Sequence, residues 1–237
     1  MPFILRVDID KPYGHHNLIK KVISKLREDY CFPRLNCFEY LKPTIELLNF
    51  CNNFNIPAFW YFRNCTIPGL KIKNLIHKGD HTVGFHAENT FNFDSFKAEF
   101  NLFEKRIGLN IKHFTKHGSG LLKLGRHHYA EYEPEKYKKW GATLNLDFSL
   151  GNGIATNFDD LQVKNNFYKN MFWMEPEYRD RNFKETANLI EYAKENIVVL
   201  VIHPSNFYTN KFVRYELEKL IQLSKENSIE WLNKIKY

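Results

Sequence analysis

The strongest constraint on the fold is a regular alternation between short apolar runs and longer amphipathic segments. Apolar side chains recur at helical spacing over residues 94–108, 182–196 and 211–227. Seven short runs are predicted as strands: residues 3–7, 58–62, 82–85, 111–115, 142–146, 170–174 and 197–202. Strands that alternate with helices form a parallel sheet, so the pattern predicts an α/β fold.

Two further observations favour a barrel over an open sheet. The run IVVLVI at residues 197–202 is apolar throughout, which is typical of a strand buried on both faces. The sequence also has no Gly-rich nucleotide-binding loop, no internal repeat and no Gly/Ser-rich linker. We therefore predict an irregular (β/α)7-type barrel, made by a single domain that spans residues 1–237.

The composition is that of an ordinary soluble protein with an excess of positive charge. Hydrophobic residues make up 43% of the chain and the formal net charge is +7. This charge favours acidic partners, such as nucleic acid, anionic glycans, phosphates or an anionic membrane surface. The sequence contains no segment that resembles a secretory signal, a transmembrane helix or a nucleic-acid-binding motif. We expect a cytoplasmic protein that binds no nucleic acid, and its oligomeric state stays open.

One predicted helix near the start of the chain carries two kinds of side chain. Leu18, Val22 and Leu26 repeat at helical spacing. Basic residues form a second face of the same helix: Lys20, Lys21, Lys25 and Arg27. The simplest interpretation is that the basic face is solvated.

Polar and ionisable side chains follow almost every predicted strand. In (β/α) barrels the loops at the carboxyl ends of the strands converge and carry the chemistry. The side chains at these positions are Asp8, Asp10, Arg63, Asn64, His86, Glu88, His117, Asp147, Glu175 and His203. A group of imidazoles and carboxylates at one rim predicts a catalytic site.

The chemistry that this set indicates is metal-assisted hydrolysis. A divalent ion held by His and Asp polarises a carbonyl and lowers the pKa of its bound water, while a second carboxylate takes a proton and a His protonates the leaving group. Asp8 and Asp10 follow the first strand. We expect the strand to leave the sheet at Asp8, so that both acids point into the mouth of the barrel.

Five segments resemble, in order, the motifs of the polysaccharide deacetylase family, the carbohydrate esterases that share the NodB homology domain. They are RVDID (6–10), GDHTVGFHAENT (79–90), FTKHGSG (114–120), TLNLDFS (143–149) and VVLVIHP (198–204). The resemblance runs from residue 3 to about residue 205 and implies an irregular (β/α) barrel. It further implies that Asp8 is the general base, Asp10 and His86 are metal ligands, Asp147 orients the catalytic His and His203 is the general acid.

The sequence departs from this family pattern at two places. Thr90 stands where a second metal-binding His is expected, and Thr115, Lys116 and His117 replace the Arg and Pro of the third motif. His117 is our candidate for the third ligand, with Glu88 next. Zinc is the first choice of divalent metal, and nickel or cobalt suits similar ligands.

Two functions remain open from the sequence. The first is a metal-dependent amide hydrolase, of deacetylase or deformylase type, that deacylates an N-acylated sugar. Its expected substrate is an intracellular glycan precursor, phosphate-linked or lipid-linked. The predicted substrate-binding residues are Arg63, Glu88, His128, Tyr129 and Glu175. The second is a catalytically silent glycan-binding relative with a degenerate metal site, for which Thr90 is the best support.

Overall fold

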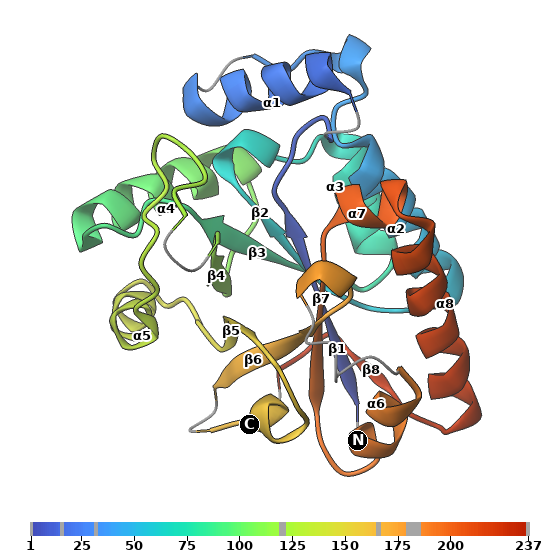
Figure 1. The fold of residues 1–237 in the computed structure, drawn as a ribbon. Helices are drawn as coiled ribbons and strands as arrows, with labels where there is room; N and C mark the ends of the chain where they lie inside the picture. Colours follow the sequence, from blue (N-terminus) through green and yellow to red (C-terminus); the bar gives the residue numbers. More distant parts are fainter. Residues whose placement is uncertain are drawn as a thin grey trace.

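Seven parallel strands form a sheet that curves into a nearly closed barrel (Figure 1). The structure is a computed structural model that describes residues 2–14, 17–30, 33–118, 122–164, 167–178 and 186–235. The strands are β1 (Phe3–Ile9), β2 (Phe59–Phe62), β3 (Thr82–Ala87), β4 (Phe114–Lys116), β5 (Leu150–Ile154), β6 (Tyr168–Trp173) and β7 (Val198–Ile202). Their order is β4-β3-β2-β1-β7-β6-β5, and β8 (Trp231–Leu232) pairs with β1 outside this path. The predicted irregular (β/α)7-type barrel is confirmed.

The helices of the described chain lie outside the barrel. They are α1 (Leu18–Tyr30), α2 (Lys42–Phe54), α3 (Leu70–Lys78), α4 (Phe93–Ile107), α5 (Pro134–Thr143), α6 (Thr186–Ala193), α7 (Pro204–Thr209) and α8 (Lys211–Glu226). Short 3₁₀ turns are η1 (Asn36–Phe38), η2 (Asn64–Thr66), η3 (Asp159–Leu161) and η4 (Pro176–Tyr178). The first part of the predicted helix 182–196 lies outside the described residues.

The side chains of β1 alternate between two apolar clusters. Phe3, Leu5 and the odd-numbered residues after them pack against the helices, whereas Ile4 belongs to the cluster inside the barrel. Because alternate residues of a strand share a face, Arg6 and Asp8 also lie on the inner side. The expectation that the strand leaves the sheet at Asp8 is wrong, because β1 continues to Ile9 and the same alternation directs Asp10 inward.

Among the described residues, side chains and one isolated backbone bridge join the barrel at its seam. β4 and β5 are the two ends of the strand path, and between them an isolated parallel bridge joins His113 to Asp147. The Asn152 side-chain amide in β5 donates to the Lys116 carbonyl of β4. Asn152 Oδ1 also accepts a hydrogen bond of 2.8 Å from Arg6. Residues of β1, β4 and β5 therefore meet at the seam.

The fifth strand lies later in the chain than the sequence predicts. The predicted strand 142–146 is wrong, because α5 extends to Thr143 and β5 begins only at Leu150. The β5 sequence, LGNGI, has little β-propensity, so its residues do not indicate a strand. Its glycines have a packing reason: a Cβ atom at Gly151 would lie 2.6 Å from the Tyr168 carbonyl oxygen of the neighbouring strand.

Candidate metal centre and active site

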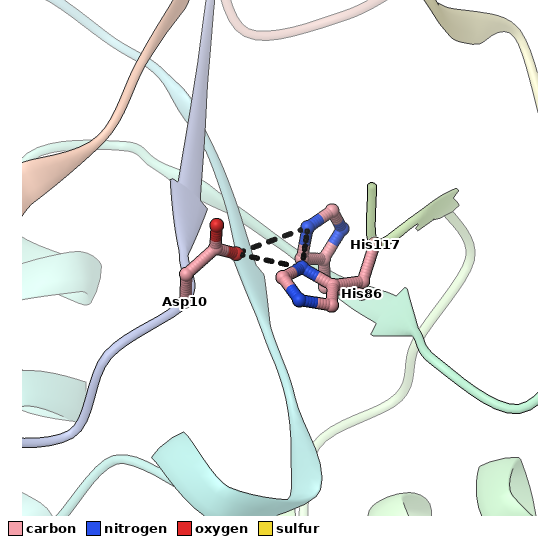
Figure 2. Close-up of side chains that lie close together, drawn as sticks. All are labelled: Asp10, His86 and His117. Atoms are coloured by element: carbon pink, nitrogen blue, oxygen red, sulfur yellow. Dashed lines mark hydrogen bonds and ion pairs between the residues drawn. The ribbon is translucent and has the colours of Figure 1, made fainter. Parts of the chain in front are cut away.

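Three of the predicted metal ligands converge at the carboxyl ends of the strands. Asp10 follows β1, His86 lies near the end of β3 and His117 follows β4 (Figure 2). The distances from Asp10 Oδ1 are 3.2 Å to His86 Nε2 and 3.1 Å to His117 Nδ1. The two ring nitrogens are 3.4 Å apart, and the three ligand atoms all lie within 4.8 Å of one another. One ion-sized point is therefore within reach of all three.

The chemistry of these groups fits a divalent ion. Asp10 Oδ1 is buried without a hydrogen-bond partner among the described residues. Burial would raise the pKa of Asp10, but the surrounding imidazoles outweigh it and hold the pKa well below its usual range. Burial lowers the pKa of His117 to about 3, so that its ring is neutral and can coordinate a metal. Two imidazoles and one carboxylate form a donor set of the kind that binds zinc and similar ions.

Neighbouring side chains fix the orientation of the three groups. His86 Nδ1 lies 2.7 Å from the Thr115 hydroxyl oxygen, which leaves Nε2 directed at Asp10. Arg63, which is 1% exposed, donates a hydrogen bond of 2.9 Å to the Asp10 backbone carbonyl. Such supporting contacts orient ligands and tune their basicity. The sequence predicts Arg63 as a substrate contact, but the structure buries it behind the candidate ligands.

Asp8 lies beside this group and is held by Arg6. Arg6 Nε donates to Asp8 Oδ1 at 2.8 Å, and the terminal nitrogen donates to Oδ2 at 2.6 Å. Burial would raise the pKa of Asp8, but Arg6 outweighs it, so Asp8 stays ionised. Asp8 Oδ2 is 3.7 Å from His86 Nε2. Sequence reasoning missed Arg6, although strand alternation places it on the same face as Asp8.

His203 approaches the same group from the end of β7. Its Nε2 lies 3.5 Å from Asp10 Oδ2, while Nδ1 lies 3.0 Å from Glu175 Oε1. The same Glu175 oxygen accepts the His203 backbone N–H at 2.8 Å, and Glu175 is fully buried. Burial disfavours the charged ring, but the Glu175 carboxylate outweighs it and raises the pKa of His203 to about 10. The imidazole is therefore protonated at neutral pH, with Nε2 directed toward Asp10.

The structure places Asp147 away from His203. Asp147 Oδ2 lies 3.7 Å from His113 Nδ1, and His113 stands just before β4. His117 follows β4, so Asp147 and the candidate metal ligands lie at opposite ends of this strand. The carboxylate that contacts His203 is instead Glu175, which the sequence predicts as a substrate-binding residue.

The remaining predicted substrate contacts have partners of their own. Glu88 Oε2 accepts a hydrogen bond of 2.7 Å from Arg63. His128 accepts from the Leu124 backbone N–H at 3.1 Å and donates to the His117 carbonyl at 2.8 Å, so both ring nitrogens are used. The Tyr129 hydroxyl donates to Glu131 at 2.5 Å.

The structure pairs Thr90, where the sequence motif leads us to expect a second His, with Tyr137. Thr90 is fully buried, and its hydroxyl donates to the Tyr137 hydroxyl at 3.3 Å. His117 reaches the group instead, from the end of the neighbouring strand.

A cavity of about 350 Å³ opens beside Asp10, His117 and His203. Its other lining residues are Lys11, Leu124, Glu177, Ser205 and Asn206. Charged, amide and hydroxyl groups in this wall can bind a polar ligand, and the volume admits one small substrate group. The ionised Asp8, the protonated His203 and the three candidate ligands together form an arrangement that can carry out proton transfer next to a metal ion.

Comparison with solved structures shows which known fold this is. A CE4 family pseudoenzyme from Bacillus anthracis matches with a TM-score of 0.50 and 9% identity, over 97% of this chain and 62% of that one. A mutant CE4 family pseudoenzyme with restored enzymatic activity matches with a TM-score of 0.51 and 10% identity, over 97% of this chain and 64% of that one. A CE4 esterase from Streptococcus mutans matches with a TM-score of 0.50 and 13% identity, over 97% and 84%. This chain has the CE4 fold.

The CE4 fold agrees with the resemblance to polysaccharide deacetylases that the sequence motifs carry. The chain spans less than two thirds of the length of the two pseudoenzyme chains. No family model matches the sequence, and no curated protein matches it. Within the described residues, no helix has the length and apolar character needed to cross a bilayer.

Proposed function

We propose that this protein is a metal-dependent amide hydrolase that removes an acyl group from an N-acylated sugar. The observation that carries the proposal is the convergence of Asp10, His86 and His117 at one point, with His203 Nε2 3.5 Å from Asp10. A divalent ion bound there would polarise the acyl carbonyl and lower the pKa of a water molecule. Zinc is the first choice, and nickel or cobalt suits the same donors.

The roles of the protein side chains follow from their charge states. Water adds its oxygen to the acyl carbon and gives its proton to the ionised Asp8, which Arg6 holds in place. The amine nitrogen then leaves as the C–N bond breaks, with a proton from His203. Glu175 positions His203 and keeps it protonated before this step. General acid–base groups of this kind contribute about 10²–10⁴-fold each to the rate.

The polar wall of the cavity supports a carbohydrate as the ligand. Ser205 and Asn206 offer a hydroxyl and an amide, and Lys11 adds a positive charge. Together with the net charge of +7, these groups favour a sugar that carries an anionic group. We propose a phosphate-linked or lipid-linked glycan precursor in the cytoplasm as the substrate.

One observation favours the second candidate, a catalytically silent glycan-binding protein. Both carboxylate oxygens of Asp8 accept hydrogen bonds from Arg6, which lowers the basicity of the acid that must take a proton. In that case the cavity binds a glycan without cleaving it.

Metal analysis and an activity assay separate the two candidates. The purified protein should hold close to one divalent ion per chain after incubation with zinc, nickel or cobalt. His86→Ala should lose this ion, whereas Asp8→Asn should keep it and lose deacylation of N-acetyl and N-formyl aminosugars. A chain that binds no ion under these conditions, or that binds an ion and glycan without hydrolysis, contradicts the hydrolase.

A further inference from the structure

Helix α1 turns its apolar side away from the protein. Leu18 is 75% exposed, Ile19 62%, Val22 52%, Leu26 40% and Tyr30 66%. Figure 1 shows α1 lying across the top of the molecule, apart from the helices that cover the barrel. Ordinary surface helices place such a stripe against the core, so this orientation is the reverse of the usual one.

The opposite face of α1 attaches to the protein through polar contacts. Lys20 pairs with Glu39 at 2.6 Å, and Glu28 pairs with Lys11 at 2.9 Å. Arg27 donates to the Cys65 carbonyl at 2.6 Å. Neither apolar cluster of the described residues includes a side chain of α1. The exposed stripe therefore contributes nothing to the core. Contiguous apolar surface exposed to water is typical of a site that binds a partner.

The loop of residues 122–126 extends the apolar stripe toward the cavity. Leu122 is 77% exposed and Leu124 is 43% exposed. Lys25 holds this loop beside α1 by donating to the Leu124 carbonyl at 2.9 Å, and the Arg126 backbone N–H donates to Asp29 at 2.9 Å. Leu124 also lines the cavity of the candidate active site.

We call this surface the α1 face. It consists of Leu18, Ile19, Val22, Leu26, Tyr30, Leu122 and Leu124. Because Leu124 belongs both to this surface and to the cavity wall, the α1 face borders the mouth of the candidate active site.

Basic side chains stand beside the α1 face. Lys21 and Lys123 are exposed, and neither has an ion pair with a described residue. Lys25 is about half exposed, and Arg126 lies over the Tyr30 ring at 5.2 Å from its centre. An apolar helix face with basic neighbours is the chemistry that binds the interface of an anionic bilayer, where side chains enter the acyl region and cations meet the headgroups.

We propose that the α1 face docks on the surface of an anionic phospholipid bilayer, with the mouth of the cavity at the membrane interface. A second copy of the chain fits less well, because pairing two such faces would bring their basic residues together. Docking would present the cavity to a sugar carried on a membrane lipid. That consequence rests on the proposed function, whereas the docking itself needs no catalytic chemistry.

Vesicle co-sedimentation tests the proposal with a matched control. The test variant is Leu18→Gln/Val22→Gln/Leu26→Gln, in which Gln preserves helix propensity. The control is Leu70→Gln/Val163→Gln/Leu109→Gln, whose positions are the same residue types with similar exposures of 75%, 48% and 37%. Circular dichroism and thermal unfolding confirm that both variants fold.

The wild type should bind vesicles of phosphatidylcholine with phosphatidylglycerol and bind weakly to phosphatidylcholine alone. The α1 variant should lose on the order of tenfold or more in affinity, and the control should bind as the wild type does. Lys21→Glu/Lys123→Glu should weaken binding to the anionic vesicles, by less at high salt than at low salt.

Three outcomes would overturn the proposal. They are no binding of wild type to anionic vesicles, equal losses in the α1 variant and its control, and a concentration-dependent dimer that disappears in the α1 variant while vesicle binding is absent. His86→Ala serves to separate this proposal from the enzymatic one. It should bind vesicles as the wild type does, so a failure of hydrolysis leaves the docking result unaffected.

Discussion

Two histidines of the candidate site, His117 and His203, have opposite charge states because their surroundings differ. His117 is buried beside Arg63 as well as Asp10, and burial lowers its pKa to about 3. His203 is also buried, but Glu175 contacts it directly and raises its pKa to about 10. A histidine side chain can therefore be a neutral ligand on one side of Asp10, as His117 is suited to be, and a proton donor on the other side, as His203 is suited to be. The partner of each ring, rather than burial alone, decides its role.

The largest effect is expected for a change of His117, the candidate metal ligand, and it distinguishes this residue from His203, the candidate acid. His117→Ala should lower both the divalent metal content and the deacylation rate, the rate on the order of 10³-fold, because two protein ligands hold the ion poorly. Elemental analysis and the activity assay measure the two quantities. Normal metal content in this variant would show that His117 is not a ligand.

His203→Gln should give a different pattern, which sharpens the comparison. The variant should keep its metal, because His203 is not among the three grouped ligands, and should lower kcat by about 10²–10⁴-fold through loss of the general acid. A substrate with a good leaving group should recover part of the lost rate. Loss of metal from this variant would instead assign His203 to the metal.

A smaller effect is expected when the partner of His203 is changed. Glu175→Gln removes the carboxylate that stabilises the protonated ring, so the pKa of His203 falls. The alkaline limb of the kcat profile, which reports loss of the acid, should move to lower pH, with kcat reduced by about 10–100-fold at neutral pH. An unchanged pH profile would show that Glu175 supports the fold alone.

The same test on Asp147 provides the matched control. Because Asp147 contacts His113 at the other end of β4, Asp147→Asn should leave the pH profile unchanged. A shift equal to that of Glu175→Gln would restore the role that the sequence motif implies for Asp147.

The smallest effect is expected at Thr90. Its hydroxyl bonds to Tyr137 and not to the grouped ligands, so Thr90→Val should change metal affinity by less than about twofold. Titration with zinc under competition from a chelator measures this affinity. A large loss would mean that Thr90 takes part in the metal site.

The sequence predicts six of the seven barrel strands and the grouping of three candidate metal ligands, because both depend on local patterns. Asp10, His86 and His117 follow or end apolar runs, and parallel strands bring such positions to one rim. The sequence could not predict that Glu175, rather than Asp147, contacts His203, because this contact depends on the position of β5. Two glycines weaken the strand pattern of β5. The fourth motif therefore overlaps a predicted strand, residues 142–146, that the structure does not contain.

Helix α1 shows a second limit of sequence patterns. The spacing of Leu18, Val22 and Leu26 predicts a helix correctly. Periodicity states which residues share a face, but it carries no information on whether that face meets the core or the outside. The basic face is only partly solvated, because Lys20 and Arg27 are buried in polar contacts with the rest of the chain.

The seam of the barrel links the pairing of β4 and β5 to the position of Asp8 in the candidate site. Asn152 of β5 contacts both the β4 backbone and Arg6, and Arg6 in turn holds Asp8. A folding intermediate in which β5 has not yet docked therefore lacks one of the contacts that orient this arginine. Local opening between β4 and β5 would therefore loosen Arg6, and through it Asp8, while most of the sheet remains intact.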